Sequence, residues 1–361
     1  MSKNQRLTEK LTLEFIENCE NFWKRDLESK NLDTKHKKIL EEFNKDYLKN
    51  ISLLSKNLIN WKMQGDYGVP MQFSYNYFKN IGFKKSLINL LKFFSGRMTD
   101  QTYNKNLTLD DYEILKMTRA NELLTNFSAH NNPFFDDYFF LEKNISTTPR
   151  WSRYLYIANK LQKNLLNNES IWLDIGSYYG GLQSIIKKIY PDITIFMVDF
   201  NHQLLRSYVY LKSIFPNDNH LILNRNNKND LKKISKGSVV YINSNDFSHL
   251  DQCKLDLVTN FFSFGEMKNE EFSNFYNSTI INNSKNIYLC NRFVSSPFFE
   301  RTYDNKIDIT NYLKTNFKIE YLDVFPIHNY SISKRSLFGR TSKRPYGSQS
   351  FELHLKNSKI V

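Results

Sequence analysis

Two short segments in the second half of the chain carry the residues best suited to binding a ligand. Residues 172–181 read WLDIGSYYGG, an apolar run followed by an acid and a turn with glycines. Residues 193–199 read ITIFMVD, a second apolar run that ends in Asp199. A glycine-containing turn between a strand and a helix, with an acid at the end of the next strand, is typical of sites that hold a nucleotide and its ribose hydroxyls.

The composition of this turn indicates which kind of nucleotide. A dinucleotide-binding turn has the pattern GxGxxG, in which the second glycine lets the backbone approach a pyrophosphate. Here the matching frame is Gly176-x-Tyr178-x-x-Gly181, and the tyrosine would obstruct a pyrophosphate. S-adenosylmethionine has no phosphates, so a tyrosine at this position does not obstruct its binding. We therefore expect S-adenosylmethionine as the cofactor, with Asp199 accepting hydrogen bonds from its ribose and Phe200 flanking its adenine.

The elements that must position these residues alternate between strands and helices from Ile171 onward. Strands are expected at 170–176, 193–199, 220–224, 238–243, 255–262 and 286–293, and helices at 181–190, 202–215 and 269–280. Continuous apolar strands alternating with helices indicate a parallel sheet covered on both faces. Two further strands, 317–325 and 350–357, have no good helix between them, which favours an antiparallel final pair. The expected fold class is α/β.

The first part of the chain has a different pattern. Residues 1–165 have apolar residues at three- and four-residue spacing, so we expect an α-helical N-terminal region there and a ligand-binding domain at 166–361. Specific helices are expected at 40–61, 86–94, 110–127 and 153–166, with an irregular stretch at 131–151. The N-terminal helices could serve as a cap, a substrate-binding region or a surface for homo-oligomer formation.

Composition limits the possible partners and compartment. The 361 residues include 50 basic and 37 acidic ones, for a net charge of +13, which favours anionic partners. Lysine is abundant along the whole chain, however, so we attribute the charge to overall composition and expect no nucleic acid. Cys19, Cys253 and Cys290 form no CxxC pair, and no run is long and apolar enough for a signal peptide or membrane span. We expect a cytoplasmic protein without a metal site.

Three stretches carry a resemblance to a known family. LDIGSYYGGL, VDFNHQLLRSYVYLKSIFP, and LVTNFFSFGEM followed by YLCNRF resemble the sugar O-methyltransferases of bacterial surface-polysaccharide loci. The resemblance extends from about Asn132 to the C-terminus. It implies a Rossmann-like class I S-adenosylmethionine-dependent fold with an antiparallel last strand. It also implies methylation of a sugar hydroxyl in a capsule or lipopolysaccharide glycan, or in its nucleotide- or phosphate-linked precursor.

By this resemblance, the first turn holds the methionine end of the cofactor. The residues expected to do so are Asp174, Gly176, Tyr178, Gly180 and Gly181. For the adenine we expect Asp246 and Phe247, with Asn224 as the alternative to Asp246.

The loop after strand 255–262 lies nearest the transferred methyl group in this fold, and it contains Asn260, Ser263 and Glu266. Methylation of a hydroxyl requires that its proton be removed, and a positioned base contributes roughly 10²–10⁴-fold to the rate. Glu266 is the first candidate for this base or for positioning the acceptor. The other candidates are Ser263 and His202, with His249 and His328 as further alternatives. Glu266 could instead only stabilise the start of the next helix.

Basic and aromatic residues are expected to bind the acceptor. Asn291 and Arg292 end the next strand, at the same edge of the sheet. The connection 326–349 carries Arg340 and Arg344, and a basic lid of this kind suits a phosphorylated or acidic acceptor; a solvated loop is the alternative. The segment 146–156 offers Arg150, Trp151 and Arg153, where the indole could stack on a sugar ring.

Two other functions fit the same patterns. The net charge of +13 would suit an RNA methyltransferase, although NFFSF lacks the Asn/Asp-Pro-Pro-aromatic motif that base-directed enzymes often carry. The unusual GSYYGG and DFNH segments would suit a methyltransferase fold that has lost its activity and serves as a scaffold. Cofactor titration and retention of RNA at physiological salt separate these alternatives.

Overall fold

The chain forms two compact units. The computed structural model describes residues 3–19, 87, 100–132, 138–223, 228–251, 253–295, 306–328 and 349–359. An α/β unit comprises residues 1–60, 161–325 and 348–361, and a second unit comprises residues 61–160 and 326–347. One junction, at residue 160, is close to the expected boundary at 165, but residues 1–60 group with the α/β unit and not with the second one. The helices expected at 40–61 and 86–94 lie outside the described residues, apart from Leu87.

The second unit contains helices and a small hairpin. Its elements are α7 (Asp100–Met117), α8 (Asn121–Asn126), η1 (Ala129–Asn131), β1 (Phe139–Glu142), β2 (Ile145–Thr147) and the first part of α9 (Pro149–Asn164). The expectation of one helix over 110–127 was wrong, because Arg119 adopts a left-handed φ of 60° that separates α7 from α8. The stretch expected to be irregular contains the antiparallel hairpin of β1 and β2. Helix α9 begins at a proline, whose fixed φ suits a first helical position.

The α/β unit is built on an eight-stranded sheet with the order β11-β12-β8-β7-β3-β4-β6-β5. The strands are β3 (Ile171–Ile175), β4 (Thr194–Asp199), β5 (His220–Leu223), β6 (Val239–Asn243), β7 (Leu257–Phe261), β8 (Asn286–Arg292), β11 (Phe317–Val324) and β12 (Ser350–Asn357). All of the pairings from β5 to β8 are parallel. Strand β12 is antiparallel to both of its neighbours, β8 and β11.

This topology confirms the expected α/β fold class. The sheet is Rossmann-like, mostly parallel with an antiparallel last strand, and β5 lies at its edge beyond β6. The remaining elements of the unit are α1 (Lys3–Asn18), α10 (Gly181–Ile189), α11 (Asn201–Ile214), η2 (Lys228–Lys233), η3 (Ser244–Leu250), η4 (Phe264–Glu266), α12 (Asn269–Tyr276), α13 (Thr279–Asn282), β9 (Val294–Ser295), β10 (Ile307–Asp308) and η6 (Ile309–Tyr312). The helix expected over 269–280 is two helices, because the side chain of Ser278 caps a new one.

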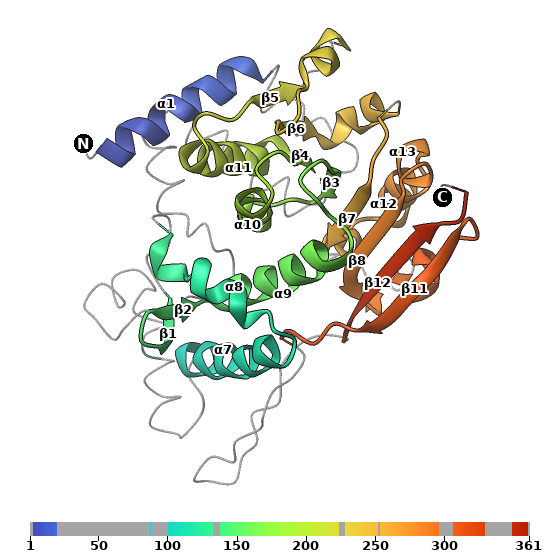
Figure 1. The fold of residues 1–361 in the computed structure, drawn as a ribbon. Coiled ribbons are helices and arrows are strands. Elements are labelled where there is room, and N and C mark those ends of the chain that lie inside the picture. The colour runs from blue at the N-terminus through green and yellow to red at the C-terminus, as the bar shows by residue number, and fades with distance from the viewer. Residues whose placement is uncertain are drawn as a thin grey trace. The chain divides into compact units, whose positions relative to one another are not determined.

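Helices cover both faces of the sheet (Figure 1). Figure 1 shows α10 and α11 on one side and α12 and α13 on the other. Alternation along β6 illustrates the two faces: Val240 and Ile242 belong to the core that contains Phe272 of α12, whereas the ring of Tyr241 contacts the ring of Tyr208 on α11 at 5.3 Å. Side chains that alternate along a strand point to opposite faces. The strands are therefore buried on both sides, as their continuous apolar sequences require.

Helix α1 packs within the α/β unit. Phe15 is fully buried, and its ring contacts Tyr208 at 5.2 Å and Tyr241 at 6.3 Å. Glu14 forms an ion pair of 2.6 Å with Lys212 of α11. These contacts explain why the first residues group with the sheet.

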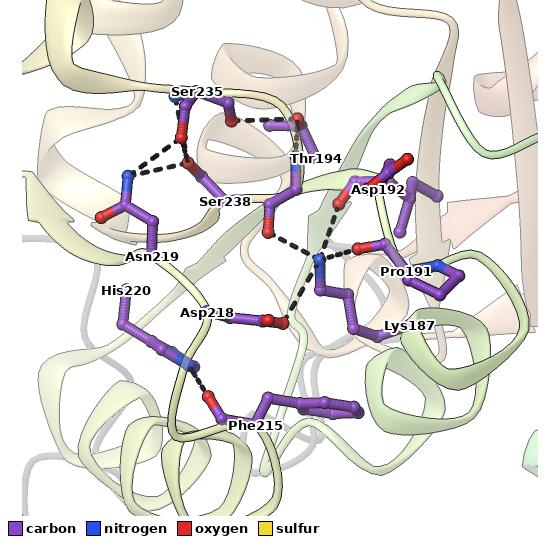
Figure 2. Close-up of polar contacts among 12 residues, drawn as sticks. Lys187, Pro191, Asp192, Thr194, Phe215, Asp218, Asn219, His220, Ser235 and Ser238 are labelled. Atoms are coloured by element: carbon purple, nitrogen blue, oxygen red, sulfur yellow. Dashed lines mark hydrogen bonds and ion pairs between the residues drawn. The ribbon is translucent and has the colours of Figure 1, made fainter.

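A buried lysine joins three loops at the amino ends of the parallel strands (Figure 2). The Lys187 ammonium donates to the carbonyl oxygens of Pro191 at 2.5 Å and Gly237 at 2.6 Å. It also lies 3.4 Å from the carboxylate of Asp218. Burial lowers the pKa of Lys187, while Asp218 raises it. The network lies at the edge of the sheet opposite to the expected ligand site, so its role is to hold the starts of β4, β5 and β6 together.

Candidate functional site

The candidate site lies at the carboxyl ends of the parallel strands. Strand β3 is central, with β4, β6 and β5 on one side and β7, β8, β12 and β11 on the other. The chain therefore reverses its direction across the sheet between β3 and β7. In open parallel sheets, ligands bind outside the carboxyl ends of the strands at such a switch point. The loops that follow β3, β4, β7 and β8 contain most of the residues singled out in the sequence.

The turn after β3 has an unusual backbone. Gly176, Tyr178 and Gly180 all have left-handed φ values, of 75°, 53° and 87°. A Cβ atom on Gly176 would lie 2.4 Å from the Cβ and Oγ atoms of Ser263, in the loop after β7. One on Gly180 would lie 2.9 Å from Leu211. Both glycines are thus required by close packing as well as by φ.

Asp199, at the end of β4, lies beside this turn. Its Oδ2 accepts a hydrogen bond from the backbone N–H of Tyr178 at 2.9 Å, and its Oδ1 accepts one from Phe200 at 2.8 Å. The side chain is half-buried. The acid is therefore held in place by backbone N–H groups of the two turns.

Asp174 has a different environment from the one expected. It is 2% exposed, and its two carboxylate oxygens accept hydrogen bonds from Gln183 at 2.5 Å and Thr259 at 2.6 Å. Burial, opposed by these two hydrogen bonds and reinforced by the charge of Asp199, raises the pKa of Asp174 to about 7. The carboxyl group thus joins β3 to α10 and β7 beneath the turn, where it positions the turn.

Asn260 connects the ends of three strands. Its amide nitrogen donates to the carbonyl of Ile175 at 2.7 Å, and its Oδ1 accepts from the backbone of Phe264 at 2.9 Å and from the amide of Asn291 at 3.1 Å. The side chain is fully buried. A buried asparagine with all these partners fixes the loop after β7 relative to β3 and β8.

A shallow recess, open to solvent, lies beside this loop. It is lined by Phe262, Gly265, Glu266, Asn291 and Arg292. Glu266 is exposed and Arg292 is half-buried. The Oδ1 atom of Asn291 is buried and has no hydrogen-bond partner among the residues that the structure describes. The carboxylate and the guanidinium can together bind a polar molecule, and the carboxylate can accept a proton from it.

Other expected residues lie near the ends of β4 and β6. The imidazole of His202 is 3% exposed and stacks on the ring of Phe200 at a centroid distance of 5.9 Å. Asp246 is buried in η3, whereas Phe247 packs against Phe275 at 4.8 Å in the core. The expectation that Phe247 presents an apolar face to a ligand is therefore corrected. Asn224 lies outside the described residues.

The second unit holds the residues expected just before the first strand. Trp151 is 3% exposed, and its indole N–H donates to the carbonyl of Phe127 at 2.6 Å, so it is a core residue and cannot stack on a sugar. Arg153 donates to His328 Nδ1 at 2.9 Å. Burial lowers the pKa of His328, while Asp111 raises it. Arg150 is half-buried in the same helix.

The remaining expectations concern two arginines of the connection 326–349, a metal site and a membrane span. Arg340 and Arg344 lie outside the described residues. Within the described ranges, no group of three or more His, Cys, Asp or Glu side chains could hold a metal ion. None of the helices in these ranges is long and apolar enough to cross a membrane.

Sequence reasoning missed four residues that shape the site. Gln183 and Thr259 bind Asp174, and Asn243 at the end of β6 donates to Asn201 at 2.7 Å. Arg206 of α11 lies over the ring of Tyr178, with 4.8 Å between its guanidinium carbon and the ring centroid. Asn243 could have been found, because it is a polar residue at the end of an apolar strand. No local signal distinguishes Arg206 from other helix residues.

Comparisons with known proteins place the fold in context. No family model and no curated protein matches the chain. Among solved structures, magnesium protoporphyrin IX methyltransferase from Synechocystis PCC 6803 with bound SAH has 14% identity and a TM-score of 0.35, over 57% of this chain and 82% of that one. A protein from Galdieria sulphuraria that is assigned as a sarcosine dimethylglycine methyltransferase has 10% identity and a TM-score of 0.36, over 58% of this chain and 88% of that one. Geranyl diphosphate methyltransferase in complex with SAM has 10% identity and a TM-score of 0.33, over 58% and 86%.

All three neighbours are named as methyltransferases, and two of them were crystallised with SAM or SAH. Likenesses at these identities and TM-scores identify no reaction or substrate for this chain. The fold follows from its own strand order and pairing directions.

Proposed function

We propose that the protein is an S-adenosylmethionine-dependent O-methyltransferase. Its acceptor in this proposal is a sugar hydroxyl of a surface glycan or of a nucleotide- or phosphate-linked precursor. The observation that carries the proposal is Asp199, which two backbone N–H groups hold at the switch point of the sheet. The acceptor class rests on the sequence resemblance and on the side chains of Glu266 and Arg292, which line the shallow recess beside the loop after β7.

The residues around the switch point fit the cofactor. The two ribose hydroxyls are donors, and the half-buried carboxylate of Asp199 is an acceptor placed at the end of β4 for them. A carboxylate at this position also disfavours a phosphate, as expected for a cofactor that has none. Helix α10 begins at Gly181 without a side-chain cap on its first N–H groups. Such an amino terminus suits the carboxylate of the methionine end.

In this proposal the acceptor hydroxyl lies beside the residues that line the recess. When bound, the cofactor supplies an electrophilic methyl group, so the protein must orient the hydroxyl and remove its proton. Glu266 is the exposed carboxylate of the recess and is proposed to accept that proton. Arg292, which is half-buried and lines the same recess, would contact an anionic group of the acceptor.

The cofactor assignment is tested by calorimetric titration with S-adenosylmethionine and with S-adenosylhomocysteine. We expect a dissociation constant in the micromolar range, where about 1 μM corresponds to roughly −8 kcal/mol. Asp199→Ala should weaken binding by roughly 1.5–3 kcal/mol, which is the usual contribution of a hydrogen bond to a charged group. Asp251→Ala, which removes an exposed carboxylate from the same unit, is the control and should bind like the wild type. A folded wild-type protein that binds neither compound would refute the proposal.

The chemical step is tested with Glu266→Gln, which keeps the shape of the side chain but removes the proton acceptor. Turnover with a panel of nucleotide-linked sugars should fall by roughly 10²-fold or more, while cofactor affinity stays nearly unchanged. Glu270→Gln, an exposed residue at the start of α12, is the matched control. Full turnover of Glu266→Gln would exclude it as the base. If the protein methylated RNA but no sugar, the acceptor would be RNA and the proposed sugar acceptor would be wrong.

A further inference from the structure

One residue of the first turn adopts a conformation that its side chain disfavours. Of the three left-handed residues in the turn, two are glycines and the third is Tyr178, with φ 53°. In an L-residue with a Cβ atom this conformation is strained, and bulky residues rarely adopt it. The backbone N–H of Tyr178 is also the donor to Asp199 Oδ2. The strained residue thus supplies one of the two backbone N–H groups that hold the acid in place.

Contacts from α11 offset this strain. The guanidinium of Arg206 lies over the ring of Tyr178, with its Cζ 4.8 Å from the centroid. Its Nη1 donates to the Tyr178 hydroxyl at 3.2 Å and to Gln203 Oε1 at 3.1 Å. Arg206 is only 5% exposed, and a cation–ring contact is stronger when it is removed from water. The far end of the tyrosine side chain is therefore fixed to the helix, and its backbone is held in the turn.

We propose that Arg206 is a positioning residue for cofactor binding and that it acts through Tyr178. A glycine at position 178 would adopt the left-handed conformation without help. This chain has a tyrosine there, and Arg206, the sixth residue of α11, supplies the anchor that a glycine would not need. The inference rests on the proposed function, because the ligand whose binding it supports is S-adenosylmethionine.

The test is a double-mutant cycle on cofactor affinity, measured by calorimetry with S-adenosylhomocysteine. Arg206→Met should weaken binding by about tenfold, in line with the loss of one desolvated cation–ring contact. Tyr178→Ala should weaken it similarly, because alanine keeps the strain and loses the anchor. Tyr178→Gly should bind within about threefold of the wild type, since glycine carries no such strain. In the Tyr178→Gly background, Arg206→Met should then have no further effect.

Lys212→Met is the matched control. Lys212 lies on the same helix, and its ammonium is 5.1 Å from the centroid of the Tyr208 ring, a similar contact away from the turn. The Lys212→Met variant should bind S-adenosylhomocysteine as tightly as the wild type. An equal loss of affinity on Arg206→Met in both backgrounds would overturn the inference, because Arg206 would then act without Tyr178. No loss in the wild-type background would overturn it as well.

A second measurement separates this inference from the proposed function. In the ligand-free protein, hydrogen exchange of the residue 178 amide should be about tenfold faster in Arg206→Met than in the wild type, because the bond to Asp199 opens more often. This readout requires no cofactor. If the wild type binds no cofactor but exchange responds in this way, the function is wrong and the anchoring is right. Unchanged exchange would refute the anchoring itself.

Discussion

His220 should make the stability of the α/β unit depend on pH. The residue begins β5 and is half-buried. Its Nε2 donates to the carbonyl of Phe215 at 2.9 Å, and its Nδ1 accepts from the hydroxyl of Tyr241 at 2.9 Å. Burial lowers its pKa from 6.5 to about 4; Phe215 and Asp218 oppose this change, and the charges of Lys212 and Lys187 add to it. The imidazole is therefore neutral in the native state at physiological pH.

The sign of the effect follows from proton binding. Below about pH 6.5 the unfolded chain takes up a proton at His220 and the native state does not, so stability is lost as the pH falls and levels off below about pH 4. At about 1.4 kcal/mol per tenfold change in proton affinity, the full effect is about 3 kcal/mol. About 2 kcal/mol of this should be lost between about pH 7.5 and about pH 5.

The assay is urea unfolding of the wild type and of His220→Gln, followed by circular dichroism over this pH range. Glutamine keeps an N–H donor and does not titrate. Burial also lowers the pKa of His328 and His354, so the wild-type curve contains their contributions too, and the difference between the two proteins isolates His220. His249→Gln, another half-buried histidine of the same unit, controls for the loss of a histidine as such. The reasoning would be refuted if the free energy of unfolding of the wild type and of His220→Gln changed with pH by the same amount, within about 0.5 kcal/mol.

Three further substitutions test the packing that positions the site, each by its free energy of unfolding. Lys187→Met should cost roughly 3–5 kcal/mol, because it leaves the carboxylate of Asp218 and two loop carbonyls without their partner. The control is Lys188→Met, at the exposed neighbouring position. An equal loss of stability in both variants would contradict the role of the network. Phe15→Ala should cost roughly 3–5 kcal/mol, and Leu13→Ala on the exposed face of α1 much less; similar losses would show that α1 does not belong to the core. Asn260→Ala should cost roughly 2–4 kcal/mol and should also weaken cofactor binding, because it unpairs buried groups of three strands. Retention of both stability and affinity would show that Asn260 does not hold the site.

Much of the α/β unit could be predicted from the sequence. Continuous apolar runs such as 193–199 are typical of strands in a sheet covered on both faces, and the lack of a helical sequence pattern between the last two strands indicated the antiparallel final pair. Position along a strand also predicted which residues lie near one another, because residues that end parallel strands meet at one edge of the sheet. Asp199, Asn260 and Asn291 are at that edge for this reason.

Other expectations failed where side-chain direction or distant packing decides the outcome. Trp151 and Phe247 are the residue types that stack on ligands, but each has a partner far away in the sequence, and the sequence does not show which side of an aromatic residue is buried. The break between α7 and α8 depends on one backbone angle at Arg119. Helix α1 joins the sheet through Phe15, whose ring contacts lie about two hundred residues further along the chain.

The sequence by itself thus determined the order of strands and helices, the α/β class and the edge of the sheet where a ligand would bind, because these depend on hydrophobic periodicity and on the direction of the chain. Only the tertiary structure decided what each polar residue at that edge does. Asp174 and Asp199 end neighbouring strands with similar sequences, yet one carboxylate is enclosed by Gln183 and Thr259 while the other faces the two turns. That difference depends on which side of each strand the carboxylate points to and on which neighbours enclose it, and these neighbours come together only when the chain folds.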